Sequence, residues 1–351
     1  MSRRARTIAL FVTFGLLGAA LVAGVLLPVP YVRLSPGPVY DALSEVDGEP
    51  VVSVTGADTY PTSGSMGITT VYEKGSPGSR LSLLEAMRGW IAGSDDVLPR
   101  DLLFPPDAFQ GDDAGDQFEQ QGRLEMEESE QNAVVAALLY AGQPVTFQVL
   151  VDATQPDTPA DGVLRHGDVV VEVDGDPITT YRDVKQAMAD VVPGDEVTVV
   201  VRRQGERREL TLTTIPNPDD EQRAYLGVSL ALGFRSPVKV DVALANVGGP
   251  SAGLMFSLAI VDTLTPGPLT GGASVAGTGT ISPRGDVGPI GGIVQKMYGA
   301  RADGATLFLA PRSNCREVVG NEPDGLTVAA VGTLDDAVAV LDGDAAPQPC
   351  T

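Results

Sequence analysis

The sequence Gly248-Gly249-Pro250-Ser251-Ala252-Gly253 joins two apolar segments. Residues 238–245 precede it and read as an extended strand, whereas residues 252–261 follow it and carry no charge. The pattern predicts a strand, a glycine-rich turn and a helix that starts near Ser251. Such a turn lets the backbone approach a substrate, and the first turn of a helix offers unpaired N–H groups to a developing oxyanion. Pro250 has no N–H, so the expected donors are Ser251 itself or residues near it, with Gly249 and Ala252 as the candidates.

Ser251 is therefore a candidate nucleophile, although a serine ahead of an apolar run is also a common helix N-cap. A second motif favours the chemical interpretation. In Pro289-Ile290-Gly291-Gly292-Ile293-Val294-Gln295-Lys296, a helix is expected to begin after the glycines, with Lys296 at the edge of its apolar stripe. A lysine drawn into a partly buried place loses its proton more easily and can serve as a base for a serine.

Elimination supports this pairing. The chain has one histidine, His166, in a loop-like stretch far from any nucleophile motif, so a Ser-His-Asp triad has no suitable base. An unperturbed lysine with a pKa of about 10.4 is neutral in roughly one molecule in 2,500 at pH 7, so the base role requires burial. The cysteines and the single histidine do not make a zinc site, and no cofactor is predicted.

These motifs and their spacing closely resemble the proteolytic domain of Lon proteases, which use a Ser-Lys dyad. The stretch Thr278-Gly279-Thr280-Ile281-Ser282-Pro283-Arg284-Gly285 also resembles a strand and turn of that family, and by this match Thr278 contacts the dyad lysine. The family often has an aspartate three residues before the serine. Here that position is Gly248, so the role of that carboxylate is absent or moved.

Charge and hydropathy indicate the compartment. The net charge of −22 argues against nucleic acid as a partner. Residues 8–32 carry no charge, and residues 8–27 are long enough to span a bilayer, whereas a cleavable signal peptide usually has a shorter apolar core. Arg3, Arg4 and Arg6 are expected to stay cytoplasmic, which predicts a signal anchor with the catalytic part outside the cell membrane. Cys315 and Cys350 then fall in an oxidising compartment and could pair, or remain two free thiols.

A second domain is predicted in residues 145–215. The run Gly167-Asp168-Val169-Val170-Val171-Glu172-Val173-Asp174-Gly175, a helix over 180–191 and a strand after Pro193-Gly194-Asp195 together resemble a PDZ domain. Such domains bind a peptide as an added strand at a sheet edge. The loop that grips a peptide carboxylate is not evident, and Tyr140-Ala141-Gly142-Gln143 occupies roughly that place.

The protease-like part could begin earlier than residue 226. Residues 126–133 are similar to a helix that precedes the catalytic half of Lon, and residues 67–72 could form its first strand, which would make the PDZ domain an insertion. The expected organisation is given by six ranges: a cytoplasmic tip at 1–7, an anchor at 8–30, a linker and N-terminal protease part at 31–140, a PDZ domain at 141–217, a Lon-like domain at 226–343 and a tail at 344–351. Within 31–140, residues 34–48 are expected to be an extended linker and residues 93–120 an exposed loop. Two helices are expected there, one over 82–91 with Ser82 and Glu85 spaced as a capping box, and one from about Gln121 to Tyr140.

The expected fold is an α/β (α+β) Lon-type proteolytic domain plus a PDZ domain, with one N-terminal transmembrane helix. No phosphate-binding Gly-x-x-x-x-Gly-Lys-[Ser/Thr] motif occurs, so no ATP-driven step is expected. The sequence thus predicts an ATP-independent serine endopeptidase that cleaves extended peptides, and the resemblance implies a homo-oligomeric ring. Two alternatives remain: a non-catalytic PDZ scaffold, and an acyl transferase or amidase using the same pair of residues.

Overall fold

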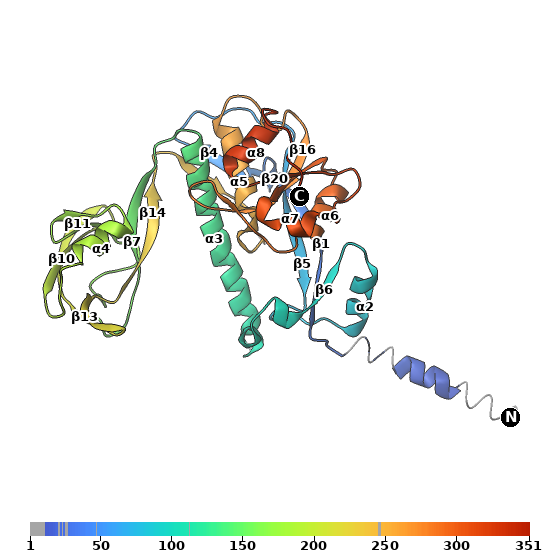
Figure 1. Cartoon of the computed structure of the whole chain (residues 1–351), viewed down its shortest axis with the longest axis horizontal. Helices are drawn as coiled ribbons and strands as arrows, with labels where there is room; N and C mark the ends of the chain where they lie inside the picture. The colour runs from blue at the N-terminus through green and yellow to red at the C-terminus, as the bar shows by residue number, and fades with distance from the viewer. Residues whose placement is uncertain are drawn as a thin grey trace, which may run out of the picture. The chain divides into compact units, whose positions relative to one another are not determined.

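The computed structural model describes residues 11–19, 22, 24, 27–46, 48–111, 113–244 and 247–351. The described residues form two compact units (Figure 1). The larger unit contains the chain up to Gly142 and again from Val238, and the smaller unit is the intervening stretch Gln143–Pro237. The larger unit is thus assembled from two stretches of sequence on either side of the smaller one.

A mixed six-stranded sheet forms the centre of the larger unit, in the order β20-β19-β16-β5-β1-β6. The first four of these strands run parallel, whereas β1 is antiparallel to both β5 and β6. Four consecutive residues of β5, from Met66 to Thr69, are buried, which shows that both faces of the sheet are covered. The bounds are β1 Tyr31–Asp41, β5 Ser65–Lys74, β6 Asp96–Pro99, β16 Ser274–Gly277, β19 Leu307–Pro311 and β20 Thr327–Val331.

Helices pack on this sheet and on one another. Helix α6 lies against β1 and β5, while α5 packs against β5 and β16 and is itself covered by α3. All residues of α5 except Thr263 are buried, so the uncharged run that follows Ser251 is a core helix. The helices of this unit are α2 Leu83–Ile91, α3 Ala114–Tyr140, α5 Gly253–Leu264, α6 Ile293–Ala302, α7 Cys315–Val318 and α8 Leu334–Leu341.

Short elements complete the larger unit. Strand β4 pairs antiparallel with β15, which ties the two stretches of the unit together, and β2 pairs with β3 and β17 with β18. The bounds are β2 Glu45–Val46, β3 Glu49–Pro50, β4 Val52–Thr55, β15 Lys239–Val242, β17 Thr280–Ile281 and β18 Val287–Gly288, with single 3-10 turns η1 Arg100–Leu102, η2 Pro106–Phe109, η3 Pro250–Ala252 and η4 Arg312–Asn314.

Two expectations for the first part of the chain are wrong. Residues 34–48 were expected to be a linker, but β1 is a strand inside the sheet, and its register shifts between Pro36 and Val39. This irregularity accommodates prolines that cannot donate to a regular ladder. Residues 93–120 were expected to be a loop, but they contain β6, η1, η2 and the start of α3. That helix begins at Ala114 instead of about Gln121, with the acidic residue Asp116 in its first turn.

The smaller unit is an antiparallel sheet in the order β11-β10-β8-β7-β14, with α4 and a β12–β13 hairpin beside it. Its core is aliphatic and includes Val149, Val170 and Val199. The bounds are β7 Thr146–Thr154, β8 Val169–Val173, β9 Asp176–Pro177, α4 Tyr181–Ala187, β10 Glu196–Arg203, β11 Glu206–Thr213, β12 Ile215–Asn217, β13 Asp220–Tyr225 and β14 Val228–Arg235.

The expected boundary between the two parts, at residues 217–226, differs from the structure. Strand β14 pairs along its whole length with β7, so it belongs to the smaller unit, and the larger unit resumes only at Val238. The sequence of β14 does not reveal its partner, because the paired residues of β7 lie 74 to 89 positions earlier in the chain and pairing at that distance is decided by tertiary contacts.

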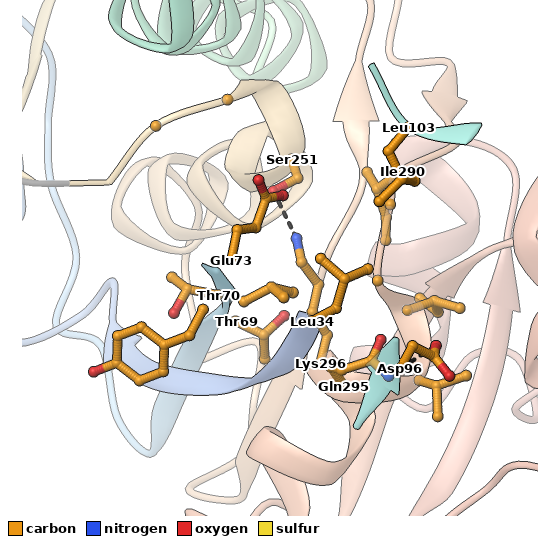
Figure 2. A pocket seen from close by; sticks show the side chains of 18 of the residues that line it. Leu34, Thr69, Thr70, Glu73, Asp96, Leu103, Ser251, Ile290, Gln295 and Lys296 are labelled. Carbon is orange, nitrogen blue, oxygen red and sulfur yellow. Dashed lines mark hydrogen bonds between the residues drawn. The ribbon is translucent and has the colours of Figure 1, made fainter. Parts of the chain in front are cut away.

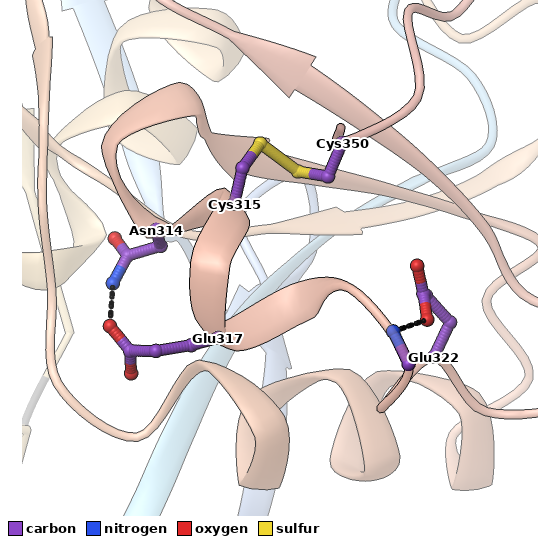
Figure 3. Close-up of a disulfide and its surroundings, with 6 residues drawn as sticks. Asn314, Cys315, Glu317, Glu322 and Cys350 are labelled. Carbon is purple, nitrogen blue, oxygen red and sulfur yellow. Dashed lines mark hydrogen bonds between the residues drawn. A yellow bond between two sulfur atoms is a disulfide. The ribbon is translucent and has the colours of Figure 1, made fainter.

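The C-terminal tail is attached to the larger unit by a disulfide between Cys315 and Cys350, so the first of the two alternatives for these cysteines is realised (Figure 3). The tail also supplies the carbonyl of Gln348, which accepts a hydrogen bond from Ala330 N in β20 at 2.7 Å. The otherwise open edge of the sheet is therefore partly covered.

The expected membrane anchor at residues 8–30 falls partly on residues outside the described ones. Residues 11–19 are helical. None of the helices in the described part of the chain combines the length and the apolar character needed to cross a membrane.

Candidate active site

Ser251 lies in the 3-10 turn η3, directly ahead of the buried helix α5. Helix α3 holds this turn from outside. Ser129 Oγ donates a hydrogen bond to Pro250 O at 2.9 Å, and Gly249 N donates to Gly122 O at 2.9 Å. Gly249 has φ +83° and ψ 159°, a conformation that glycine alone adopts without strain. The glycine-rich motif therefore places the serine at a tight entry into α5.

The backbone of Ser251 is fixed a second time from the stretch between β16 and β17. Its carbonyl accepts hydrogen bonds from Thr278 Oγ1 at 3.0 Å and from Gly279 N at 2.9 Å. Thr278 is almost fully buried, at 1% exposed. These contacts hold the serine between α3 on one side and the Thr278–Gly279 segment on the other.

Lys296 enters the same place from α6, where it lies in the first turn and is 3% exposed. Its Nζ is 2.6 Å from Ser251 Oγ (Figure 2) and 3.0 Å from Thr278 Oγ1. Because the single hydroxyl proton of Thr278 is donated to Ser251 O, its oxygen can only accept from Nζ. Thr278 thus takes one N–H of the Lys296 amine and orients the amine so that its lone pair can face the hydroxyl of Ser251.

The protonation of Lys296 follows from its surroundings. Burial lowers its pKa to about 7, while the negative charge of Glu73 acts in the opposite direction and raises it. At neutral pH an appreciable fraction of the amine is therefore neutral, compared with roughly one molecule in 2,500 for an exposed lysine. A neutral amine at 2.6 Å can accept the hydroxyl proton of the serine.

Glu73 was not predicted as a site residue. It lies at the end of β5 and lines the same cavity as Ser251 and Lys296 (Figure 2). Removal of its carboxyl group from water raises its pKa, and the neighbouring Lys296 lowers it to a lesser extent. No local sequence signal could have identified it, since Glu73 and Ser251 are far apart in the chain. The one indirect hint was Gly248. It stands where Lon proteases often have an aspartate, so a carboxylate at the site had to come from another part of the chain.

These residues line an open cavity of about 660 Å³ in the larger unit. Its volume is within the range of ligand sites in proteins. The wall combines apolar side chains, including Leu34, Leu98 and Ile290, with the backbone of the two glycine-rich motifs. An extended peptide segment can therefore reach Ser251 with its side chains against apolar surface.

The expected oxyanion donors have different environments. The N–H of Gly249 is already bonded to Gly122 O, so the expectation for Gly249 is wrong for the conformation described. The reason is the close passage of α3, which the motif itself does not reveal. Ala252 is 2% exposed and follows the serine directly, and its role as a donor stays a prediction.

His166 lies in a turn of the smaller unit, where its Nδ1 is 2.7 Å from Asp152 O.

A second cavity, of about 720 Å³, lies in the smaller unit. It is bounded by α4 and the residues after it and by the start of β14, whose outer edge has no partner strand in the described sheet. The stretch Tyr140–Gln143, which in the sequence occupies roughly the place of a carboxylate-gripping loop, is not part of it, because α3 ends at Tyr140 in the larger unit. The turn that does border the cavity is Leu226–Gly227, in which Gly227 has φ +73°.

Comparison with known proteins assigns both units to domain types. Residues 238–341 match the family model of the Lon protease (S16) C-terminal proteolytic domain, and residues 117–214 match that of the PDZ domain. The PDZ match begins inside α3 and ends before β14, so it is displaced from the compact unit Gln143–Pro237. The chain thus contains a PDZ domain and a Lon-type proteolytic domain, a domain of serine proteases.

Several Lon proteases are similar over part of the chain. That of Haemophilus influenzae is 39% identical over 93 residues, which is 26% of this chain and 11% of the relative. Lon protease 2 of Herpetosiphon aurantiacus is 40% identical over 95 residues, again 26% and 11%. Lon protease 1 of Sorangium cellulosum is 31% identical over 162 residues, or 45% and 20%. The chain therefore spans one fifth or less of the length of these relatives.

Among solved structures, the PDZ domain of the SdrC-like protein from Listeria innocua aligns with 24% of this chain and 92% of its own length, with 21% identity and a TM-score of 0.22. The assignment of the PDZ domain rests on the family model.

Proposed function

We propose that the protein is an ATP-independent serine endopeptidase in which Ser251 and Lys296 form a catalytic dyad. One observation carries the proposal. The buried amine of Lys296, with a pKa lowered to about 7, lies 2.6 Å from the hydroxyl of Ser251 at the wall of a cavity that is open to a peptide. A capped helix start, the alternative for this serine, would not require a buried lysine at its side chain.

The chemistry follows from this contact. Neutral Lys296 takes the proton of Ser251 Oγ while the oxygen attacks the scissile carbonyl carbon, and the carbonyl oxygen becomes an oxyanion near the start of α5. The intermediate collapses as the C–N bond breaks, and the ammonium of Lys296 gives its proton to the leaving amine. Water then attacks the acyl group on Ser251 with Lys296 again as base, which regenerates the serine and releases the new carboxyl terminus.

Substrates are proposed to be extended segments of secreted or membrane-associated proteins. The cavity of the larger unit suits an unfolded segment, and the open edge of β14 suits the addition of a peptide strand in the PDZ domain. A membrane-anchored, extracytoplasmic location is part of the proposal, supported by the uncharged residues 8–27, the preceding arginines and the disulfide.

The test uses the full chain in mild detergent, because β1 begins at Tyr31 and a truncation at Leu34 would remove part of a sheet strand. The protein is incubated with casein without ATP, and new peptide termini are identified by mass spectrometry. Ser251→Ala and Lys296→Ala are each expected to lower the rate by at least about a thousandfold, as for other residues that act as one catalytic unit.

Lys239→Ala, which removes an exposed lysine of β15, is the matched control and is expected to retain full activity. Cleavage that persists in folded Lys296→Ala would exclude the dyad. Absence of cleavage by the folded parent protein, with casein and with short peptides, would instead favour a scaffold whose PDZ domain binds exported polypeptides.

A further inference from the structure

Helix α2 directs four of its large apolar side chains into solvent. Leu83, Met87, Trp90 and Ile91 are between 39% and 82% exposed. Their spacing of four, seven and eight residues places them on one face of the helix. A surface helix normally buries such a face, so the orientation of α2 requires an explanation.

The buried side of α2 explains why these side chains face outward. Its buried residues are the small ones, Ala86 and Gly89. A Cβ added to Gly89 would come within 2.5 Å of Val97 Cγ2 in β6 and 3.2 Å of Arg33 Cδ in β1. The backbone of α2 thus lies directly on the sheet through small residues, and the arrangement leaves Leu83, Met87, Trp90 and Ile91 largely exposed.

The exposed face lies where the chain arrives from its apolar N-terminal segment. Val29 N donates a hydrogen bond to Leu81 O at 2.9 Å, and Pro28 forms a β-bridge with Ser82, the N-cap of α2. The ring of Tyr31 makes an edge contact with that of Trp90, with centroids 5.6 Å apart. Residues 8–27, which carry no charge, therefore lead into the fold beside α2.

The segment 74–91, which contains α2, carries a charge opposite in sign to that of the whole protein. Residues 74–91 contain three basic residues, Lys74, Arg80 and Arg88, and one acidic residue, Glu85, in a chain of net charge −22. Glu85 is paired with Lys74 and also closes the capping box at Ser82. Arg80 and Arg88 are exposed and form no ion pair among the described residues. Exposed arginines beside apolar and aromatic side chains match the headgroup and acyl regions of an anionic bilayer.

We propose that the exposed face of α2 (Leu83, Met87, Trp90 and Ile91) inserts into the surface of the phospholipid bilayer next to the N-terminal anchor. The inference rests on the proposed membrane anchoring. Under this proposal, β1 links the lipid surface to the cavity of Ser251. The strand starts beside α2 at Tyr31 and reaches the cavity at Leu34, three residues later. Three residues of strand span about 10 Å, so the cavity opens close to the lipid surface and selects segments of substrates near their membrane attachment.

Trp90 allows a direct test, because it is the only tryptophan of the chain. The full chain is reconstituted into phosphatidylcholine–phosphatidylglycerol vesicles, recovered by flotation, and its tryptophan emission is recorded with and without lipids brominated in the acyl chain. We expect a blue-shifted emission, quenching by brominated lipid of roughly twofold or more, and protection from acrylamide in the water phase.

Two variants show whether α2 is responsible. Ile91→Glu changes the most exposed residue of the face and is expected to restore access of acrylamide to Trp90 and to reduce quenching by brominated lipid. Val319→Glu, at a half-exposed site after α7, is the matched control and should leave both signals unchanged.

The outcomes separate the two proposals. A chain that does not float with the vesicles would contradict membrane anchoring and the lipid contact together. A chain that floats while Trp90 stays open to acrylamide and insensitive to brominated lipid would overturn the inference about α2 alone. Protection of Trp90 that depends on protein concentration and not on lipid would assign the face to contact with a second copy of the chain. None of these outcomes changes the casein cleavage expected in detergent, so the proteolytic activity is tested independently of the lipid contact.

Discussion

At the scale of single residues, Lys296 carries a conflict between stability and function. Its pKa is about 7 in the folded protein, far below that of a lysine in the unfolded chain. Below pH 7 the lysine is protonated in both states, and the folded state bears the full cost of the buried charge. Between pH 7 and about 10 the unfolded chain binds more protons, so this cost falls and stability rises with pH.

Lys296→Met should therefore stabilise the protein while abolishing activity. The expected gain in the free energy of unfolding is at most about 5 kcal/mol below pH 7, reduced by the two hydrogen bonds lost. The gain should be smaller at pH 9. Urea unfolding at both pH values measures it, with exposed Lys239→Met as control. A variant that is less stable than the parent at pH 6 would contradict this account of the buried amine.

Glu73 should set the pH at which the proposed protease becomes active. Its negative charge raises the pKa of Lys296, so Glu73→Gln should increase the neutral fraction of the amine. The acidic limb of the profile of kcat/KM against pH then moves to lower pH, and the variant is more active than the parent near pH 6. Glu128→Gln, at an exposed site on α3, should leave the limb in place. A shift toward higher pH would show that Glu73 does not act through charge on Lys296.

At the scale of elements, the wall of the cavity depends on a clamp made by Asn314. This residue is 2% exposed; its Oδ1 accepts from Ile290 N at 3.0 Å, and its Nδ2 donates to Ile290 O at 2.9 Å and to Glu317 at 3.0 Å. It lies directly before Cys315, so the disulfide to Cys350 secures the segment that holds the clamp (Figure 3). The clamp fixes the residues that precede the helix of Lys296.

Asn314→Ala leaves both backbone groups of Ile290 without their partner, at a cost of about 1–3 kcal/mol for each group that remains buried and unsatisfied. Because Ile290 lines the cavity, KM for a peptide should rise by about tenfold, with a smaller effect on kcat. The acidic limb of the pH profile should stay where it is, since the surroundings of Lys296 Nζ are unchanged. A fall in kcat with a displaced limb would show instead that the dyad itself has moved.

At the scale of the whole molecule, the two cavities lie in separate units and can be tested separately. Val184→Asp places a charge in the apolar groove between α4 and β14, and it should raise KM for an unfolded protein substrate by about five- to tenfold. An internally quenched short peptide should be cleaved as by the parent. Leu232→Asp, also on β14 but outside the groove, is the control. An equal loss with both substrates would indicate that the PDZ domain acts on catalysis rather than on binding.

The sequence by itself determined the features that depend on short-range order. The capping box of Ser82 and Glu85 joins residues three positions apart, and α2 forms with both of its hydrogen bonds. The two glycine-rich motifs likewise predicted the turn before α5 and the start of α6. Ser251 and Lys296 were paired by the chemistry of their motifs and by the lack of another base, not by any pattern of hydropathy.

Only the tertiary structure decided what depends on distant partners. Tertiary packing makes β1 a strand inside the sheet despite its two prolines, and it pairs β14 with β7. It also places α3 so that the N–H of Gly249 donates to the carbonyl of Gly122. It also brought Glu73 to the cavity, although 178 positions separate it from Ser251. Local sequence cannot encode these results, because the contacts that stabilise them are made between segments that meet only when the sheet and its covering helices have packed.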